Sequence, residues 1–399
     1  MPAIEPADLR RPYLVIPKLI DQPTWGGAYI VEAKGWADRG DLGRRKIGQS
    51  YELFSGSNLS LLDDTAHSAF EGELTDRDAV QIATTAPHAI PLASLMAADA
   101  AATLGAERVQ SHGGHLDLLL KFTQALGNSF QVHIKAGLTH PKYKPKPESW
   151  YYFEPGLVTL GVKPGIDWAA YEQALTDISA GMGELSAQVT SGHLARATAD
   201  ARIAELLKTN DPWQYVNEVA PKAGDLVDLS SGALHHSWEE DPDRAPRGNV
   251  LYEIQSEAMD DISTFRGFDK GKMGQDGSVR AVHVKEYFEF IDRTPELNDP
   301  HNHIHQPRNL TRTHDFTFDH LLETPYYCLD QLEFTGQTGL FRDTISTFKH
   351  LFVKTGQIRV TAGGHGVIVG AGHSAFVPAA AHEYQVENLA GPSQVIISY

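Results

Sequence analysis

Hydrophobic and polar residues alternate in several short runs of this chain, and glycine, proline or aspartate separates the runs. Such alternation is typical of β-strands with one buried face, because successive strand residues point to opposite sides of a sheet. In the run that begins at Phe130, the polar residues Gln131 and His133 are two positions apart. They are therefore expected to share one face of a strand. A second β-rich run, Ser149 to Phe153, follows a connection rich in proline and lysine.

Residues 166–207 show a different pattern, with apolar residues at helical spacing. Asp167 precedes the first run and is a suitable N-cap, because its carboxylate can accept backbone N–H bonds. Residues 193–210 have the same helical character, and a third helix is predicted over residues 90–105, ending at Gly105. The pattern therefore predicts a helical insertion within a mainly β chain. One face of its first helix carries Trp168, Tyr171, Leu175 and Ile178.

Four potential metal ligands accompany the β-rich segments. Gln131 and His133 share a strand face, and Glu148 stands at the entrance of the second run. His235 follows a turn formed by serine and glycine, and His236 beside it would point to the opposite face of a strand. An amide, two imidazoles and a carboxylate form a mixed nitrogen and oxygen set that suits one divalent metal. A single site is expected to use His235 rather than His236.

The spacing around His235 resembles a motif of the cupin barrels, G-x5-P-x-G-x2-H. Gly224, Gly232 and His235 fall on this motif, with Ser230 in place of the proline. A related spacing recurs near the C-terminus at Gly372, Pro378 and His382. The resemblance implies a mainly β fold of two cupin (jelly-roll) barrels with a helical insertion. We expect residues 1–160 and 211–295 to form an N-terminal catalytic barrel, residues 161–210 the insertion, and residues 296–399 a C-terminal barrel without metal.

Within the cupins, the whole chain resembles the type I phosphomannose isomerases, also called mannose-6-phosphate isomerases. Several landmarks of that family recur in the same order between Trp25 and Tyr399. They are WGG at 25–27, IGQSYELF at 47–54, LLLKF followed by SFQVH at 118–133, KPES at 146–149, GALH at 232–235 and FVPA at 376–379. Gln49 stands where the family usually has an acidic residue.

This resemblance implies a zinc-dependent aldose–ketose isomerase. Its reaction would convert mannose 6-phosphate reversibly to fructose 6-phosphate through a cis-enediol. By the same resemblance, one Zn²⁺ per chain would be held by Gln131, His133, Glu148 and His235. Because a mixed nitrogen and oxygen set also suits other transition metals, Mn²⁺, Fe²⁺ and Co²⁺ remain alternatives.

Basic residues near these ligands are the candidates for catalysis and for binding the substrate. The resemblance assigns Arg266 and Lys146 to catalysis, whereas Glu257 and Asp260, before Arg266, are acidic alternatives that we do not favour. Lys144 and Lys146 lie on one side of an extended chain and would provide a basic patch for a sugar phosphate. Lys121 lies in an apolar strand, where an ammonium group needs a partner or a cavity. We expect Lys121 and Lys144 to bind the substrate.

Composition excludes several other classes of protein. The 51 acidic residues outnumber the 34 lysines and arginines, so the net charge of −17 disfavours nucleic acid and anionic membranes as partners. No apolar run approaches the roughly 18 residues needed to span a bilayer, and the N-terminus lacks the features of a signal peptide. A single cysteine, Cys328, suits a reducing compartment. A cytoplasmic protein is therefore expected, and the family resemblance implies a small sugar phosphate as its partner.

Alternatives remain for both the metal site and the function. His301, His303 and His305 would share a face if their segment were extended, and three histidines at this spacing can bind a transition metal. They lie in a connector rich in proline and asparagine. The same fold and metal could also serve an isomerase of another or unphosphorylated sugar. A third hypothesis is a cupin that binds a sugar without catalysis.

Overall fold

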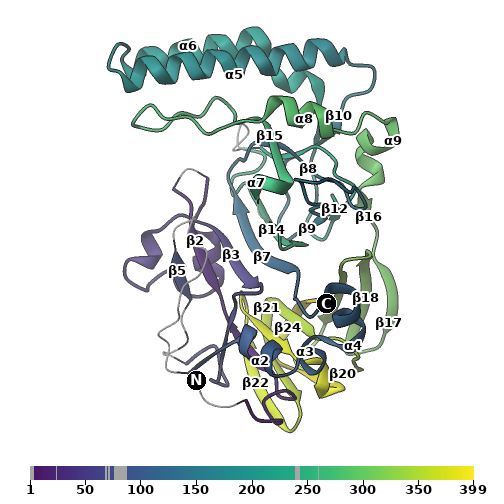
Figure 1. Ribbon diagram of the computed structural model, residues 1–399. Coiled ribbons are helices and arrows are strands. Elements are labelled where there is room, and N and C mark those ends of the chain that lie inside the picture. Colours follow the sequence, from purple (N-terminus) through teal and green to yellow (C-terminus); the bar gives the residue numbers. More distant parts are fainter. Residues whose placement is uncertain are drawn as a thin grey trace. The chain divides into compact units, whose positions relative to one another are not determined.

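The computed structural model describes residues 4–23, 25–67, 70, 72–75, 88–238, 243–258 and 260–399. The chain forms two compact units (Figure 1). Unit 1 comprises residues 1–124, 250–257 and 305–399, and unit 2 comprises residues 125–249 and 258–304. Among the described residues, no helix is both long and apolar enough to cross a membrane.

Unit 1 is built mainly from antiparallel strands. One sheet runs in the order β17-β18-β19-β24-β21-β23-β1-β4-β6, and β20 and β22 pair with β24 and β21 at its side. Its strands are β1 (Tyr13–Ile16), β4 (Asn58–Ser60), β6 (Ala89–Pro91), β17 (Arg308–Arg312), β18 (Phe316–Glu323), β19 (Cys328–Phe334), β20 (Gly339–Thr344), β21 (Lys349–Ala362), β22 (His365–Gly370), β23 (Ser374–Val377) and β24 (Glu383–Ser398). A second series of strands runs β14-β7-β3-β2-β5, with β2 (Lys18–Asp21), β3 (Ile47–Leu53), β5 (Glu73–Thr75), β7 (Leu118–Ala125) and β14 (Asn249–Ser256).

The first strand of the chain pairs with a strand close to its end. Tyr13 of β1 lies opposite Phe376 of β23 in an antiparallel register. The first 124 residues therefore lie in the same compact unit as residues 305–399. The sequence-based division, which joins residues 1–160 to 211–295, differs from these units and stays a prediction.

Short helices in unit 1 interrupt the strands. They are α1 (Tyr29–Ala33), α2 (Leu92–Ala98), α3 (Ala100–Leu104) and α4 (Ala106–His112). The helix predicted over residues 90–105 is thus divided at Asp99, whose extended backbone ends α2 and whose carboxylate accepts a bond from the Ala102 N–H at the start of α3. Gly105 ends α3 as predicted, with φ of 106°. Aspartate favours such caps because its side chain competes with the helical backbone bonds.

A buried ion pair lies inside unit 1. Lys34 Nζ is 2.7 Å from Glu52 Oε1, and both side chains are fully buried. Glu52 also accepts hydrogen bonds from the hydroxyls of Ser50 and Ser374, at 2.6 and 2.9 Å. The Lys34 ammonium also donates to the carbonyl of Gly372. Each charge is therefore surrounded by polar partners, as burial away from water requires.

Unit 2 combines a five-stranded sheet with long helices. The sheet order is β11-β10-β13-β8-β15, and β12 pairs separately with β9. The strands are β8 (Phe130–His133), β9 (Glu148–Tyr152), β10 (Val158–Val162), β11 (Val216–Val219), β12 (Leu226–Asp228), β13 (His235–Ser237) and β15 (Thr264–Phe268), and β16 (Ile304–His305) lies at the boundary with unit 1. The helices are α5 (Trp168–Thr190), α6 (Arg196–Asn210), α7 (Asp260–Ser263), α8 (Val284–Phe290) and α9 (Pro295–Asn298).

Helices α5 and α6 form the predicted insertion and lie side by side (Figure 1). The Asp167 carboxylate accepts bonds from the Ala169 and Ala170 N–H groups, which confirms it as the N-cap of α5. Apolar residues of α5, with α8, pack against one face of the five-stranded sheet. From β8, Phe130 and Val132 enter this core, and neither is exposed. The opposite face of β8 carries Gln131 and His133, as the alternation predicted.

We expect Glu52→Gln to destabilise unit 1 strongly. The substitution leaves the buried Lys34 ammonium without its counter-charge, and breaking a buried pair costs about 3–5 kcal/mol. Native-state hydrogen exchange of the unit 1 strands would measure the change in the free energy of opening. Glu387→Gln is the matched control, because its pair with Arg359 is exposed by nearly half and such pairs contribute about 0–1 kcal/mol. Equal effects of the two substitutions would contradict the expectation.

Candidate metal centre and its polar surroundings

Strand β8 and the two strands that pair with it, β13 and β15, bring several of the predicted site residues together. In the sheet register, Gln131 lies opposite His235 of β13 and also opposite Arg266 of β15. His133 lies opposite Thr264 of β15. Because directly opposed residues share a face of the sheet, these side chains converge on the face away from the helical core.

Backbone contacts fix the two segments that complete this group. The N–H of Lys146 donates to the carbonyl of Ile134 at 3.0 Å, which holds the entry to β9 beside the end of β8. The turn before His235 needs glycine at Gly232, whose φ is 82°. A Cβ there would lie 2.9 Å from the carbonyl oxygen of His133. The glycine of the cupin-like motif thus allows the His235 turn to approach β8 closely.

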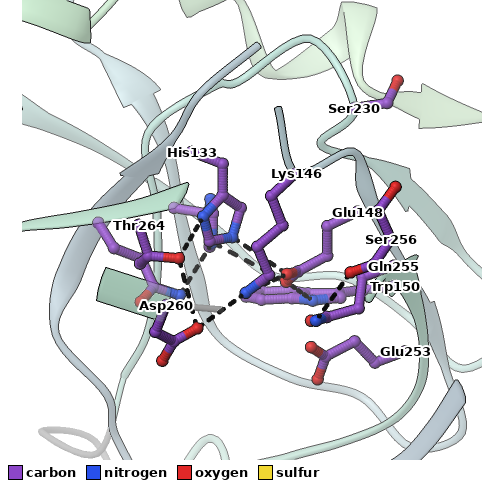
Figure 2. Close-up of polar contacts among 12 residues, drawn as sticks. His133, Lys146, Glu148, Trp150, Ser230, Glu253, Gln255, Ser256, Asp260 and Thr264 are labelled. Atoms are coloured by element: carbon purple, nitrogen blue, oxygen red, sulfur yellow. Dashed lines mark hydrogen bonds and ion pairs between the residues drawn. The ribbon is translucent and has the colours of Figure 1, made fainter. Parts of the chain in front are cut away.

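His133, Glu148 and His235 form a compact and buried group. Figure 2 shows His133 and Glu148 side by side. Their ligand atoms all lie within 4.8 Å of one another, and the three residues are at most 2 % exposed. His133 Nε2 is 3.0 Å from Glu148 Oε2, and His235 Nε2 is 3.9 Å from Glu148 Oε1. The Gln131 amide nitrogen is 3.0 Å from His235 Nε2, so the fourth predicted ligand lies at the same place. Among the described residues, this is the one group of three or more His, Cys, Asp or Glu side chains with such spacing.

Further contacts orient the three side chains. The Nδ1–H of His235 donates to the Ala233 carbonyl at 2.9 Å, which leaves the lone pair on Nε2 facing the group. The Thr264 hydroxyl lies 3.0 Å from His133 Nδ1 and can fix the ring in the same way. Trp150 donates its indole N–H to Glu148 Oε1 at 2.6 Å. Such outer partners normally set the tautomer and direction of metal ligands.

The charges of the group suit a cation. Burial lowers the pKa of His235 to about 3, with a further contribution from the neighbouring His133. Burial and the nearby Lys146 ammonium also lower the pKa of His133. Burial alone would raise the pKa of the Glu148 carboxyl, but Lys146 and His133 hold it well below its usual range. At neutral pH the site therefore offers two neutral imidazoles and one carboxylate, the protonation states that metal binding requires.

Asp260 links the two predicted catalytic residues. Its Oδ1 is 3.4 Å from Lys146 Nζ, and its Oδ2 accepts a hydrogen bond from Arg266 Nη2 at 3.0 Å. Lys146 Nζ is also 3.4 Å from Glu148 Oε2 (Figure 2). The Asp260 side chain is 47 % exposed, whereas those of Lys146 and Arg266 are 6 % and 10 % exposed. Asp260 thus forms the accessible edge of an otherwise buried charge network.

Sequence reasoning did not favour Asp260 and did not include Thr264 or Trp150. The sequence did contain one sign that these two residues lie together. Asp260 precedes Thr264 by four residues, and the two share one turn around α7. Their side chains approach to 3.5 Å. The other acidic alternative, Glu257, lies in unit 1, where it accepts two hydrogen bonds from Ser55.

The two predicted substrate-binding lysines do not join this network. Lys144 is exposed, and its backbone N–H bonds the Ile262 carbonyl. Lys121 lies in unit 1, buried in β7, and its ammonium contacts Glu253 Oε1 and Gln255 Oε1, both at 2.7 Å. The partner that an ammonium in an apolar strand requires is therefore supplied by β14.

Of the three histidines in the connector, His301 and His303 have very different surroundings. His303 is 3 % exposed, and its ring nitrogens lie 2.9 and 3.0 Å from the carbonyls of Asp228 and Leu297. The side chain of His301 is 92 % exposed and contacts Asp299. His236 was expected to point to the opposite face of its strand from His235, and this is confirmed. It packs on Phe130 and forms a hydrogen bond with Thr159, on the core side of the sheet.

Comparisons with known proteins place the fold. No family model matches the chain, and no curated protein matches its sequence. Solved structures do match. The mannose 6-phosphate isomerase of Bacillus subtilis has a TM-score of 0.63 and 15 % identity, over 98 % of this chain and 99 % of that one. A zinc-bound mannose 6-phosphate isomerase has a TM-score of 0.62 and 13 % identity, over 96 % and 98 %.

A third match is the mannose 6-phosphate isomerase of Salmonella typhimurium bound to its substrate, fructose 6-phosphate, and zinc. Its TM-score is 0.61 at 13 % identity, over 96 % of this chain and 98 % of that one. The chain therefore has the fold of the mannose 6-phosphate isomerases along nearly its whole length. This confirms the predicted fold class, a mainly β architecture with a helical insertion.

We expect the chain to bind one zinc ion, and Thr264→Val to weaken that binding by about 10–100-fold. The substitution keeps the shape of the side chain but removes the hydroxyl that orients His133, and outer partners contribute this much to metal affinity. Chelator-competition titration of the purified chain measures the affinity. His301→Ala is the control and should leave the affinity unchanged. A wild-type affinity for the Thr264 variant would contradict this role of the hydroxyl.

The pH dependence of zinc affinity should reveal whether the pKa values of the two histidines are lowered. Because the folded-state pKa values of His133 and His235 are lowered, protons compete for these nitrogens only well below pH 6.5. The affinity is therefore expected to stay nearly constant as the pH is lowered through 6.5, and to fall only at clearly more acidic pH. The same titration at successive pH values tests this. With ordinary pKa values near 6.5, each imidazole would cost about tenfold in affinity for every pH unit below 6.5, so a loss of that size directly below pH 6.5 would contradict the lowered pKa values.

Proposed function

We propose that this chain is a metal-dependent isomerase that interconverts mannose 6-phosphate and fructose 6-phosphate. One observation carries the proposal: the buried His133–Glu148–His235 group lies beside the Lys146–Asp260–Arg266 network, in a chain with the fold of mannose 6-phosphate isomerases. The group supplies cation ligands, and the network supplies proton-transfer and anion-stabilising groups. Aldose–ketose isomerisation through an enediol needs proton-transfer groups and stabilisation of a negative oxygen, and a bound metal can assist that stabilisation.

The donor set fits zinc. Two imidazoles whose lone pairs can be directed by Ala233 and Thr264, together with the Glu148 carboxylate, are typical zinc ligands. Gln131 would add its amide oxygen, because turning the terminal amide exchanges oxygen for the nitrogen that now faces His235. When bound, the metal would polarise substrate oxygens and stabilise negative charge on them. One zinc per chain is the proposed cofactor, and Mn²⁺, Fe²⁺ and Co²⁺ suit the same set.

Asp260, the exposed residue of the network, is the candidate for transferring the proton. The reaction removes a proton from C2 of the aldose and returns one to C1, through a cis-enediol. Asp260 is half-exposed and can reach a substrate, and its contacts with Lys146 and Arg266 hold its carboxylate in one position. We propose Asp260 as the base, with Lys146 as the group that exchanges a proton with a substrate oxygen.

Arg266 stabilises charge rather than moving protons. Its guanidinium is permanently charged and is held by Asp260, so it stays protonated throughout the reaction. The planar donors suit the negative oxygen of an enediolate or the oxygens of a phosphate. Its place on β15, directly opposite Gln131, fixes it with respect to the metal ligands. We propose that it neutralises the charge that develops as the C2 proton leaves.

The test is formation of fructose 6-phosphate from mannose 6-phosphate by the zinc-loaded chain, followed by ¹H NMR. His235→Ala should abolish turnover by removing a ligand. Asp260→Asn should lower kcat by about 10²–10⁴, the usual contribution of a general base, while zinc content stays at one per chain. His301→Ala is the control and should keep wild-type kcat.

Deuterium exchange makes the test sharper. In D₂O the wild-type chain should incorporate solvent deuterium into the sugar, and Asp260→Asn should slow this exchange together with turnover. An Asp260 variant that retains wild-type kcat would remove the proposed base. A folded, zinc-loaded wild type without turnover would contradict the reaction itself.

A second candidate function is isomerisation of an unphosphorylated aldose by the same groups. The observation that favours it is the surroundings of the two lysines that were predicted to bind the substrate. The Lys121 ammonium already contacts Glu253 and Gln255, and Lys144 is exposed. Mannose and fructose should therefore be assayed beside their 6-phosphates. A larger kcat/KM for mannose than for mannose 6-phosphate would select this candidate.

A further inference from the structure

Unit 2 contains a cavity that the proposed reaction does not use. Its volume is about 270 Å³, and helix α5, the end of β15 and residues 279–282 form its walls. The liquid volume of one water molecule is roughly 30 Å³, so the cavity could hold a molecule of roughly nine to twelve non-hydrogen atoms. It is at the small end of the usual size range of ligand pockets.

The cavity lies on the opposite face of the five-stranded sheet from the metal ligands. Arg266 of β15 is opposite Gln131, on the polar face. After an irregularity in the strand, Phe268 pairs with Phe130 and packs against its ring at 5.3 Å, inside the helical core. Phe268 lines the cavity. The cavity is therefore separate from the candidate metal centre, although β15 contributes to both.

Its walls combine apolar surface with an excess of positive charge. Ile178, Met182 and Val279 supply apolar side chains. Among the described residues, the charged lining residues are Asp269, Lys272 and Arg280, two cations to one anion, in a chain whose net charge is −17. Arg280 Nη1 lies 3.6 Å from Asp269 Oδ1, within ion-pair distance, and Lys272 Nζ lies 3.4 Å from the Gly127 carbonyl. The guanidinium has several donors in one plane and can bind more than one acceptor at a time.

Helix α5 contributes an exposed glycine to the lining of this cavity. Gly183 lines the cavity, is exposed, and lies in the helix interior, where glycine is less favourable than alanine. A Cβ at Gly183 would meet no atom within 4 Å, whereas one at Gly181 would lie 2.7 Å from Leu206. Packing against α6 thus accounts for Gly181 but not for Gly183. Gly183 therefore adds open space at a point where the cavity lining is exposed.

We propose that this cavity binds a small carboxylic acid with an apolar tail. The tail occupies the space between Ile178, Met182 and Val279, and the carboxylate faces Arg280 and Lys272. Apolar walls contribute affinity through buried area, and the cations select an anionic head group. The site is independent of the proposed isomerase reaction, because it needs neither the metal nor any residue of the Lys146–Asp260–Arg266 network.

The test is a binding titration of the full-length chain with probe acids, by calorimetry and ligand-observed NMR. The probes are the straight-chain acids from propanoate to octanoate and 4-phenylbutyrate, each compared with the alcohol of equal length. At least one acid should bind at one site per chain and at least roughly tenfold more tightly than its alcohol. Arg280→Leu should lower the affinity for that acid by at least roughly tenfold, whereas Asp269→Asn should raise it.

Two matched substitutions in α5 locate the binding. Ser179 lines the cavity, so Ser179→Leu should fill it and abolish binding. Ala180, the next residue, is exposed and outside the lining, so Ala180→Leu should bind the acid as the wild type does. Circular dichroism confirms that both variants fold. Failure of every probe acid to bind, or equal affinity in the two leucine variants, would overturn the proposal.

Discussion

The candidate metal centre depends on the buried carboxylate of Glu148. An ionised carboxylate that is 2 % exposed is costly unless it is paired and hydrogen-bonded. Lys146, His133 and Trp150 supply these partners at 3.4, 3.0 and 2.6 Å. Because each partner also contacts a further group, the single charge of Glu148 connects the imidazoles to the Lys146–Asp260–Arg266 network.

The five-stranded sheet allows this polar group to exist inside a folded unit. One face of β8 carries Gln131 and His133, and the other carries Phe130 and Val132, which pack under α5 and α8. The apolar face supplies the burial that stabilises the unit, while the polar face tolerates charges that pair with one another. The helical insertion therefore has a clear structural role, since it covers the apolar face and leaves the polar face to the ligands. The cavity beside Phe268 is a gap in that same covering layer.

Two of the buried charge groups among the described residues differ in whether they can be reached from solvent. In unit 1, Lys34 and Glu52 are fully buried, and hydroxyl and carbonyl groups surround them. In unit 2, the network ends at Asp260, whose side chain is 47 % exposed. Charge that is wholly enclosed can specify packing but cannot reach a substrate, whereas charge with an exposed edge can exchange protons with one. This difference supports the proposal that the chemistry takes place in unit 2, and it fits a stabilising role for the Lys34–Glu52 pair.

The sequence by itself determined the features that depend on local periodicity and capping. The alternation from Phe130 to His133 predicted one polar strand face, and Asp167 predicted the start of α5. The order of motifs indicated the fold that the solved structures share. The family resemblance implied that Gln131 and His235 share one site, but only the tertiary structure decided by which contacts such distant side chains meet. Gln131 and His235 are 104 residues apart, and Lys121 and Glu253 are 132 apart, so strand register rather than local pattern brings each pair together. For the same reason Asp260 and Thr264 joined the site only through the pairing of β15 with β8, since hydrogen bonds between strands fix contacts that no sequence window contains.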